Sequence, residues 1–397
     1  MVGITSSGFG VSTAALTEDA VAEALAAAKA AMNNGGDGIA LAFVSSTVTR
    51  NAAEVRQCFV KALPENTPIH GITSSSAILT TTGAKAGGVA CLLIGGDVSS
   101  ASSFATAFNA DSAQDAAAAL HAKMSDPQAI FMSTTPGAEE SVIAALGARF
   151  HGVPAYGGTA ADDVLDGSWS VFGNEGISGT GISLVGIGKS VGFGASMVGP
   201  YTPTKTTCVA TKADGRRVYE IDGTSAKDWV YAWLGDDVKE QYTKGGLILP
   251  QTAQKPIGIK QASPSDEFTT LHLAALGGID ETYVDFFAPV PQNATLTVMD
   301  SGDGPATGYA AALRDAYDIA KANLGDTKVK AGLLIFCGGM AIAVGDALDT
   351  GLTDPDFVSK LNGVPLMGMT CFGEQAHLAK THENVQRNLS VGLILFG

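Results

Sequence analysis

Apolar runs that end in small polar residues recur along this chain in three copies of one plan. Each copy has an apolar run typical of a strand, then a helix-like segment, then a turn that contains glycine, and then a second apolar run. The first runs occupy residues 39–47, 129–135 and 332–339, the turns residues 68–74, 154–159 and 365–371, and the closing runs residues 88–95, 181–186 and 391–396. Similar chemistry in the same order predicts that one supersecondary unit is used three times.

The spacing inside the copies supports one shared plan. Similar separations join a strand phenylalanine to the turn glycine in three pairs: Phe43 and Gly71, Phe131 and Gly157, and Phe336 and Gly368. When a helix connects two parallel strands, the carboxyl ends of both strands lie at the same edge of the sheet, where open α/β folds bind ligands. The sequence therefore predicts an α/β protein with mixed sheets built from repeated strand-helix-strand units, and a ligand pocket at the strand ends.

Local signals place helices between the strands. Thr17 is expected to cap a helix that continues to Met32, because two acidic residues follow it. Asn51 stands three residues before Glu54, which is the spacing of a capping pair at the start of a second helix. Pro136, followed by two glutamates, predicts the start of another helix.

The repeating pattern is interrupted at residues 199–203. The segments that follow are expected to form a hairpin at 212–218, a helix at 224–234, strands within 256–286 and a strand at 293–299. A boundary is predicted between residues 245 and 246. The N-terminal region, 1–245, then holds two copies of the unit, and the C-terminal region, 246–397, holds one.

The composition is that of a folded, acidic protein. Of the 397 residues, 46% are hydrophobic and only 16% are charged, and the formal net charge is −15. A chain of this length is long enough for two or three domains. The negative charge argues against nucleic acid or an anionic membrane as the main partner, and it also fits a simple role in solubility.

The five cysteines indicate a reducing compartment. Their number is odd, they are widely spread, and no C-x-x-C pair occurs among Cys58, Cys91, Cys208, Cys337 and Cys371. The chain begins without a signal-peptide pattern, and no apolar run approaches the roughly 20 residues of a membrane helix. We expect a cytoplasmic protein, or an organellar one if a transit peptide has been removed.

Several short segments occur in an order that resembles one family. They are the turn at 69–74, the glycine-rich stretch at 155–163, the stretches 209–215 and 218–223, and, further along, 256–259, 334–339 and 367–374. From about residue 37 to residue 397 the chain is similar to FIST domain proteins. The resemblance implies a FIST N-terminal-like region followed by a FIST C-terminal-like region, packed around a pocket.

That resemblance implies a function in sensing. It predicts a module that binds a small ligand, with amino acids or related metabolites as the expected ligands, and that signals through another protein chain. The sequence departs from the family pattern at Ser75, Ser76 and Met340, the last of which stands where an arginine is common. If that arginine holds an anionic ligand, this protein has changed its ligand or its way of binding it.

Cys371 is the leading candidate for a reactive side chain. It lies in a glycine-rich turn, with Glu374, His377 and His382 close in sequence. A thiol beside an imidazole and a carboxylate can act as a nucleophile or in acid–base chemistry, whereas a cysteine between apolar strands is often packed and inert. Metal binding by Glu374, His377 and His382 is a further alternative, although their spacing does not match a signature such as H-E-x-x-H.

Cys337 and Asp162 are also expected near the strand ends. Cys337 ends an apolar strand before Gly338, so it is either a pocket residue or a small core residue. Asp162 follows the turn at 154–159, where its carboxylate can hold a ligand or serve as a base. Because neighbouring residues of a strand point in opposite directions, at most one of Asp162 and Asp163 has such a role. An acidic turn without function is the other interpretation.

Hydroxyl-rich clusters stand at comparable places in the copies, at 45–47, 73–75 and 133–135. Hydroxyls and backbone N–H groups near helix starts bind carboxylates or phosphates, but helix capping explains the same residues. The turns contain no Gly-x-Gly-x-x-Gly or Walker pattern, so no nucleotide cofactor is expected. The serine hydrolase pattern Gly-x-Ser-x-Gly is also lacking.

Two functions remain open. One is a sensory protein that binds an amino-acid-like or other small polar metabolite, and its expected ligand-binding residues are Ser45, Thr73, Ser74, Ser133, Thr159, Asp162, Cys337, Gly338 and Gly373. The other is a cofactor-independent enzyme that uses Cys371, Glu374 and His382 for nucleophilic or acid–base chemistry. A scaffold that binds partner chains through apolar surface is a third possibility. No metal, cofactor, nucleic acid or membrane is expected to take part.

Overall fold

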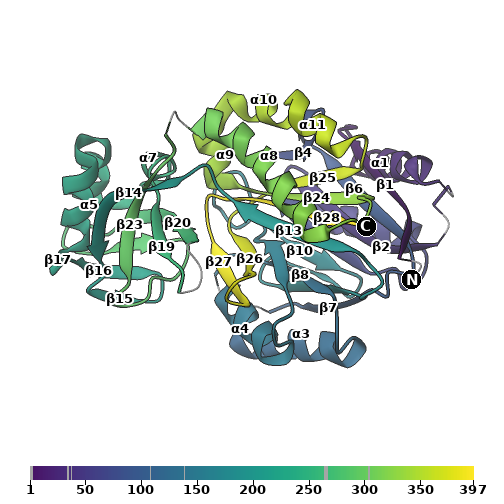
Figure 1. Cartoon of the computed structure of the whole chain (residues 1–397), viewed down its shortest axis with the longest axis horizontal. Coiled ribbons are helices and arrows are strands. Elements are labelled where there is room, and N and C mark those ends of the chain that lie inside the picture. The colour runs from purple at the N-terminus through teal and green to yellow at the C-terminus, as the bar shows by residue number, and fades with distance from the viewer. Residues whose placement is uncertain are drawn as a thin grey trace.

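The fold consists of a larger body and a smaller unit beside it (Figure 1). The computed structural model describes residues 3–33, 35–36, 38–107, 109–137, 139–262, 267–302 and 305–397. Residues 3–198 and 305–397 form the larger body, and residues 202–300 form the smaller unit.

The larger body contains the three copies that the sequence predicts. The first comprises β1 (Ile4–Ser12), α1 (Thr17–Ala31), β2 (Ile39–Thr47), α2 (Ala52–Ala62), β3 (Ile69–Ser74) and β6 (Val89–Gly96). The second comprises β7 (Ala101–Ala105), α3 (Ala110–Lys123), β8 (Ala129–Thr134), α4 (Glu139–Arg149), β9 (Ala155–Gly158) and β12 (Ile182–Ile187). The third comprises β13 (Phe193–Val198), α8 (Pro305–Leu324), β24 (Ala331–Cys337), α9 (Gly338–Val344), α10 (Leu348–Leu352), α11 (Pro355–Leu361), β25 (Leu366–Cys371) and β28 (Val391–Phe396).

All three copies arrange their strands in the same way. The orders are β1-β6-β2-β3, β7-β12-β8-β9 and β13-β28-β24-β25. In each copy the strands on either side of the second connection are parallel, as in β2 and β3. The closing strand, such as β6, runs antiparallel to its neighbours. The repeated strand-helix-strand unit and the mixed sheets are therefore confirmed.

Each copy also contributes a hairpin to the sheet of another copy. The hairpins are β4 (Ala77–Thr80) with β5 (Gly83–Ala86), β10 (Val171–Gly173) with β11 (Ile177–Ser178), and β26 (Glu374–Leu378) with β27 (Glu383–Arg387). The first hairpin pairs with β25 of the third copy, the second with β3 of the first, and the third with β9 of the second. This cyclic exchange completes three six-stranded sheets within the described residues of the larger body.

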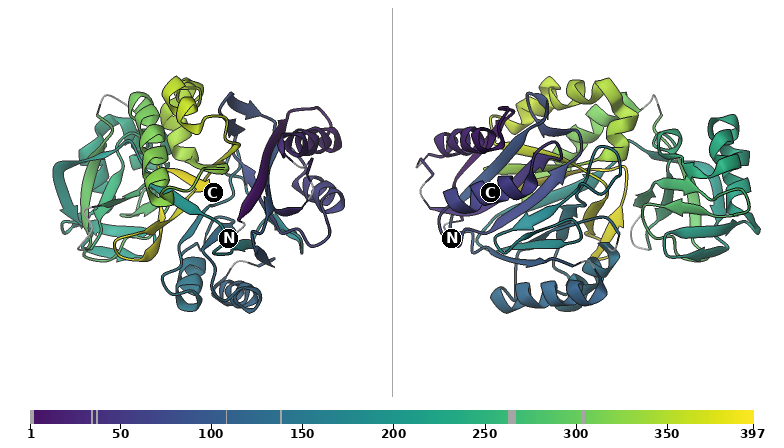
Figure 2. Two further views of the ribbon diagram at one scale, coloured as in Figure 1. Left: turned by 45° about the vertical axis from the view of Figure 1, so that its right-hand side comes forward. Right: turned by 180° about the vertical axis from the view of Figure 1, so that it is seen from behind.

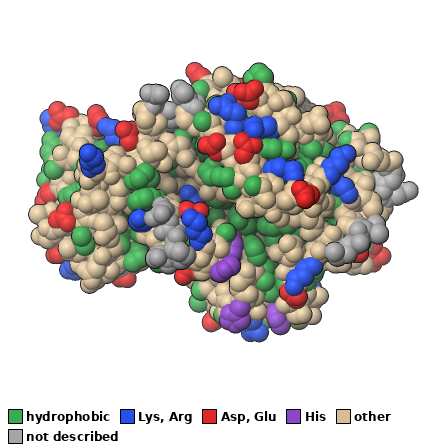
Figure 3. Space-filling view, viewed as in Figure 1, with side chains coloured by type: hydrophobic (Ala, Val, Ile, Leu, Met, Phe, Trp, Pro, Cys, Tyr) green, Lys and Arg blue, Asp and Glu red, His purple; other side chains and the backbone are tan. Residues whose placement is uncertain are grey.

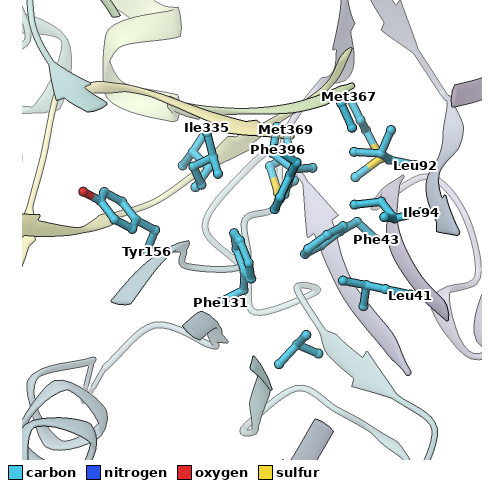
Figure 4. Packing of buried hydrophobic residues seen from close by; sticks show 14 of the residues in the cluster. Leu41, Phe43, Leu92, Ile94, Phe131, Tyr156, Ile335, Met367, Met369 and Phe396 are labelled. Carbon is cyan, nitrogen blue, oxygen red and sulfur yellow. The ribbon is translucent and has the colours of Figure 1, made fainter. Parts of the chain in front are cut away.

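The inner faces of these sheets share one apolar core. The rings of Phe43, Phe131 and Phe396 lie with their centroids 5.0, 5.5 and 5.8 Å apart, and each comes from a different sheet. Figure 4 shows these rings converging with side chains such as Leu92 and Met369. The helices cover the outer faces and form further apolar clusters there. The purple, blue and green-to-yellow helices accordingly lie on three sides of the larger body in Figure 2.

The strand register corrects one detail of the predicted repeat. Phe43 pairs with His70 and Phe131 with Tyr156, one residue before the turn glycine in each case. In the third copy, Leu333 pairs with Met367 and is therefore the residue that matches Phe43 and Phe131. Phe336 is not the matching residue. An offset of three residues reverses the face of a strand. Phe336 therefore packs against the outer helices, with its ring 4.9 Å from that of Tyr309.

The smaller unit is inserted between β13 and α8 of the third copy. Its strands are β14 (Thr202–Val209), β15 (Lys212–Asp214), β16 (Arg217–Ile221), β17 (Thr224–Ser225), β18 (Gly246–Leu247), β19 (Ile257–Lys260), β20 (Phe268–Leu271), β21 (Leu273–Leu276), β22 (Val284–Phe286) and β23 (Thr295–Asp300). Its helices are α5 (Ala226–Leu234), α6 (Lys239–Lys244) and α7 (Leu249–Thr252). It has its own apolar core. The region boundary at 245/246 stays a prediction, and that position lies inside this unit.

The local predictions are mostly confirmed. Asn51 caps α2 by accepting hydrogen bonds from the N–H groups of Ala53 and Glu54. The predicted hairpin at 212–218 forms between β15 and β16. The predicted cap of α1 is wrong by one residue, because Thr17 is the first residue of the helix and Leu16 precedes it without a side-chain cap.

The surface mixes charges of both signs. Acidic and basic side chains are interspersed over the face shown in Figure 3. Among the described residues, none of the helices has the length and apolar character needed to cross a membrane.

The turn glycines are predicted to be essential for the packing of the copies. A Cβ at Gly157 would overlap the carbonyl oxygen of Met132 on the neighbouring strand, so Gly157→Ala should lower the free energy of unfolding by about 1–3 kcal/mol or more. Gly147→Ala is the control, because this exposed helical glycine has open space around its Cα and alanine favours a helix by about 1 kcal/mol. Urea denaturation of both variants should give changes of opposite sign. If the free energy of unfolding changed in the same direction in both variants, the close packing assigned to Gly157 would be contradicted.

Candidate functional site

Three loops meet where the third strands of the copies end. In each loop, a threonine follows the turn glycine by two residues. Its backbone carbonyl accepts a hydrogen bond from a backbone N–H of another copy. The donor residue lies four positions after the turn glycine of that other copy. The pairs are Ala161 N–H to Thr73 O (3.1 Å), Phe372 N–H to Thr159 O (3.1 Å) and Ser75 N–H to Thr370 O (3.2 Å). We call these three bonds the threonine ring. They lock the loops of all three copies together.

A cavity of about 360 Å³ lies beside the threonine ring. Its walls come from the ring loops, the start of α9, the smaller unit and the loop before β28. The lining residues are Ser75, Ser76, Asp162, Asp163, Val164, Leu165, Leu249, His272, Phe287, Cys337, Gly338, Gly339, Ala341, Ile342, Leu348, Phe372 and Asn388. This volume falls in the range of small-molecule sites, and most of the lining is apolar.

His272 contributes a neutral imidazole to this cavity. It lies between β20 and β21, and its Nε2 is 3.0 Å from the carbonyl oxygen of Leu249. Burial lowers the pKa of His272 to about 4. A neutral imidazole whose Nε2–H donates to that carbonyl keeps a lone pair on Nδ1 as an acceptor.

Asn388 contributes a hydrogen-bond donor without a partner. Its Oδ1 accepts the backbone N–H of His272 at 3.2 Å, which fixes the orientation of the amide. Its Nδ2 has no hydrogen-bond partner among the described residues, although the side chain is 1% exposed. An unpaired buried donor is costly, and this atom is enclosed by its surroundings, with less than 1 Å² of its surface accessible.

Asp162 lines the cavity, as do Cys337 and Gly338 from the expected set. The Asp162 carboxylate accepts four backbone N–H groups, from Leu165 at 2.7 Å and from residues 166, 167 and 168 at 3.1, 2.9 and 3.2 Å. These bonds engage both oxygens. Asp162 therefore holds the loop that forms one wall, which agrees with the interpretation as a turn residue.

The expected hydroxyls of the first copy lie outside the cavity. Ser45 donates to Ile72 O at 3.1 Å, and Ser74 donates to Ala77 O at 2.7 Å. Thr73 accepts the N–H of Ser170 through its Oγ1 at 2.9 Å. These side chains are buried and bonded to nearby backbone groups, so they stabilise the strand ends.

The remaining members of the expected set are also engaged elsewhere. Ser133 Oγ lies 3.0 Å from His70 Nε2, and Thr159 Oγ1 donates to Glu139 at 3.0 Å. Gly373 is packed against the end of the Gln386 side chain, which would have to move to admit a Cβ there. The structure therefore divides the nine expected residues between the cavity and the strand ends of separate copies.

The expected catalytic set is not assembled. Cys371 and Glu374 are fully buried, and neither lines the cavity. His382 is exposed at the tip of the β26–β27 hairpin, whereas Glu374 stands at its opposite end, paired with Arg387. Four residues of strand span about 13 Å. The structure therefore does not bring His382 to Cys371 and Glu374, because the hairpin extends the chain between Glu374 and His382.

Burial keeps the groups around Cys371 uncharged. Burial and the neighbouring Glu374 raise the pKa of the Cys371 and Cys337 thiols well above the usual value. Burial also raises the pKa of Glu374 to about 8, against the opposing effects of hydrogen bonds from Cys337 and Ser390. In the described part of the chain no ion pair joins Glu374 to Arg387, which donates to Ser390 Oγ at 3.0 Å. A protonated thiol is a poor nucleophile, so the site does not favour thiolate chemistry.

His272, Phe287 and Asn388 are lining residues that the sequence does not predict. His272 and Phe287 lie in the smaller unit, outside the three copies, and Asn388 lies in the loop before β28 of the third copy. A polar ring between Leu271 and Leu273 was the available signal for His272. Within the described ranges, no group of three or more His, Cys, Asp or Glu side chains is placed to hold a metal ion.

Comparison with known families finds two domain models along the chain. A model of the FIST N domain matches residues 38–224, and a model of the FIST C domain matches residues 227–377. These matches cover most of the chain, and the protein belongs to the FIST family, whose domains are described as small-ligand sensory domains of signal transduction. Among curated proteins, no match is found.

The thiol of Cys371 is predicted to be inert in the folded protein. Iodoacetamide should modify the half-buried Cys58 first and leave Cys371 unmodified until the protein unfolds, because Cys371 is fully buried and its pKa is raised. Mass spectrometry of peptides from native and urea-treated protein checks this order. Cys58→Ser should abolish the early modification. Equal rates at Cys58 and Cys371 in native protein would overturn the prediction.

Glu374 is predicted to make the stability depend on pH. The native carboxyl, with a pKa of about 8, keeps a proton that the unfolded carboxyl, with its ordinary pKa of 4.5, releases. The free energy of unfolding that Glu374 contributes therefore falls as the pH rises between these values, by up to about 1.4 kcal/mol per pH unit.

Glu374→Gln removes this titration, so the variant should gain stability relative to the wild type by about 3 kcal/mol from about pH 5 to about pH 8. Urea denaturation at both pH values measures the difference. Glu65→Gln, at an exposed position, is the matched control. Wild type and Glu374→Gln curves that stay parallel would show that Glu374 is ionised in the native state.

Proposed function

We propose that this protein is a sensor that binds one small molecule, amino-acid-like or another small metabolite with polar groups, in the cavity beside the threonine ring. The observation that carries the proposal is the cavity of about 360 Å³, which both parts of the molecule line with mostly apolar side chains and a few polar ones such as His272 and Asn388. A largely apolar cavity with a few polar groups is typical of a small-molecule site.

The position of the cavity suits a sensory role. The smaller unit contributes Leu249, His272 and Phe287, while the larger body contributes the other walls. The two parts also meet at the start of α4, where Arg216 Nη2 lies 2.5 Å from Glu139 and 2.8 Å from Glu140. A ligand that contacts both parts would stabilise one arrangement of them over others. We propose that a downstream signalling protein reads that arrangement in trans.

An enzyme remains the second candidate, and one observation keeps it in consideration. Cys337 is one of the residues that line the cavity. Its raised pKa makes it a weak nucleophile in the resting protein, so binding is the better supported function.

The proposal is tested by capture from a pooled extract of small metabolites. The purified protein is incubated with the extract, and mass spectrometry compares the free, retained and newly formed compounds. Ala341→Trp should abolish retention, because a large ring at this half-buried position in α9 fills the cavity. Ala27→Trp, at an exposed position on α1, should retain the compound as the wild type does.

A compound that is retained unchanged and is lost from Ala341→Trp supports the sensor. Depletion of a compound with an equal amount of product would make the protein an enzyme. Retention that Ala341→Trp leaves intact would show that the cavity is not the binding site.

A further inference from the structure

Aromatic residues line the cavity from both parts of the molecule. Phe287 comes from the smaller unit, and its ring centroid lies 5.6 Å from that of His272. Phe372 comes from the loop after β25 of the larger body, and its ring stands nearly perpendicular to that of Trp169, with the centroids 6.0 Å apart. Both phenylalanines are half-buried, so part of each residue stays accessible. The face of an aromatic ring attracts a cation, most strongly where water is excluded.

The formal charges in the cavity wall are all negative. Asp162 and Asp163 are the acidic residues among the described lining residues, and none of these lining residues is a lysine or arginine. The loop at 162–168 contains a third aspartate and no basic residue. His272 adds no positive charge near neutral pH, because burial lowers its pKa to about 4. A cleft lined by one sign of charge concentrates ions of the opposite sign, which here are cations.

Asp163 keeps one oxygen atom for a ligand. Its Oδ1 accepts the N–H of Ser76 at 2.6 Å, and its Oδ2 has no hydrogen-bond partner within the described part of the chain. Asp162, in contrast, uses both of its oxygens on backbone N–H groups of its own loop. Asp163 is exposed to solvent, as expected for a residue at the opening of a cavity. An ammonium group that enters there can form a charge-assisted hydrogen bond with the Oδ2 atom.

The buried cation next to the cavity in sequence is occupied elsewhere. Arg387 precedes Asn388 but does not line the cavity. Its guanidinium donates to Ser390 Oγ at 3.0 Å and to the carbonyl oxygens of Met197 and Phe268 at 3.2 and 3.4 Å. A carboxylate or phosphate in the cavity would therefore meet no basic side chain among the described lining residues, and a buried charge without a partner is costly.

Much of the remaining wall is apolar. Leu165 from the loop at 162–168 is 39% exposed, and Ile342 from α9 is 55% exposed. Leu249 of the smaller unit and Leu348 of the larger body are half-buried in the same wall. Apolar surface of this kind stabilises the hydrocarbon part of a ligand by removing it from water. The wall thus suits a molecule that joins one cationic group to an apolar body.

We infer that the ligand is a small organic cation, in which an ammonium group is joined to an apolar body. The ammonium group pairs with Asp163 in a wall that also carries aromatic rings, and the apolar part lies against Leu165 and Ile342. This inference rests on the proposed function and narrows its ligand class.

Four probes with the same phenyl ring separate the possible charges. Phenethylamine carries the ammonium group, 2-phenylethanol is a neutral molecule of nearly the same shape, phenylacetate is the anion, and phenylalanine is the zwitterion. Isothermal titration of the full-length protein at pH 7 should give phenethylamine the lowest dissociation constant. We expect a difference of at least about fivefold from 2-phenylethanol and of at least about tenfold from phenylacetate and phenylalanine.

The variant Asp163→Asn tests the assigned pairing. It keeps an acceptor oxygen for the N–H of Ser76 but removes the charge, so phenethylamine should bind about threefold to fivefold more weakly while 2-phenylethanol binds as before. Asp326→Asn is the matched control, because it changes the net charge equally at an exposed position that does not line the cavity. It should leave the binding of both probes unchanged.

The variant Ile342→Ala connects the binding to the cavity. It should weaken phenethylamine and 2-phenylethanol alike, about threefold to tenfold, through lost apolar contact. Ile319→Ala, at an exposed position of α8 that does not line the cavity, should leave the binding of both probes unchanged.

The outcomes distinguish the ligand class from the function. Phenethylamine that binds no more tightly than 2-phenylethanol, or that does not bind at all, would overturn the cation. Tighter binding of phenylacetate or phenylalanine, weakened by Ile342→Ala, would overturn it while leaving a ligand site in the cavity. If Asp163→Asn weakened phenethylamine no more than Asp326→Asn does, the assigned pairing would be refuted. The proposed function is decided separately, by retention from the metabolite extract in the wild type and Ala341→Trp.

Discussion

The threonine ring is the constraint on which the rest of the structure depends. Each of its hydrogen bonds joins the loop of one copy to the loop of another, at 3.1–3.2 Å. The hairpin that leaves each loop then completes the sheet of a neighbouring copy. Without its neighbours, a copy would expose both an unpaired strand edge and the inner apolar face that carries Phe43 or Phe131. The three copies are thus parts of one folding unit, although each has the sequence pattern of an independent unit.

The candidate site exists because one copy differs from the other two. In the first and second copies, polar strand ends such as Ser45 and Thr159 bond to groups of the larger body. In the third copy, the smaller unit is inserted after β13, and it brings His272 and Phe287 to the end of β24. The insertion therefore encloses a space that the repeated architecture by itself does not enclose. A cavity between two units is also a position from which a bound ligand affects how the units are arranged.

Desolvation determines the electrostatic character of this region. The chain carries a formal net charge of −15, but in and around the cavity burial favours the neutral forms of His272, Cys337 and Glu374. The side chain of Asp162 is fixed in position by four backbone N–H groups. Because His272 is neutral, it does not balance the acidic residues of the cavity wall.

The sequence by itself determined the repeated strands, the helices between them, the hairpin at 212–218 and the family, because apolar periodicity, caps and turn glycines act over a few residues. It also nominated Asp162, Cys337 and Gly338, which follow strands whose ends line the cavity. Only the tertiary structure decided the exchange of hairpins, the match of Leu333 rather than Phe336 to Phe43, and the separation of His382 from Glu374. It alone placed His272 beside Asn388. These features depend on pairing between segments that are far apart along the chain, and local patterns do not encode which segments pair.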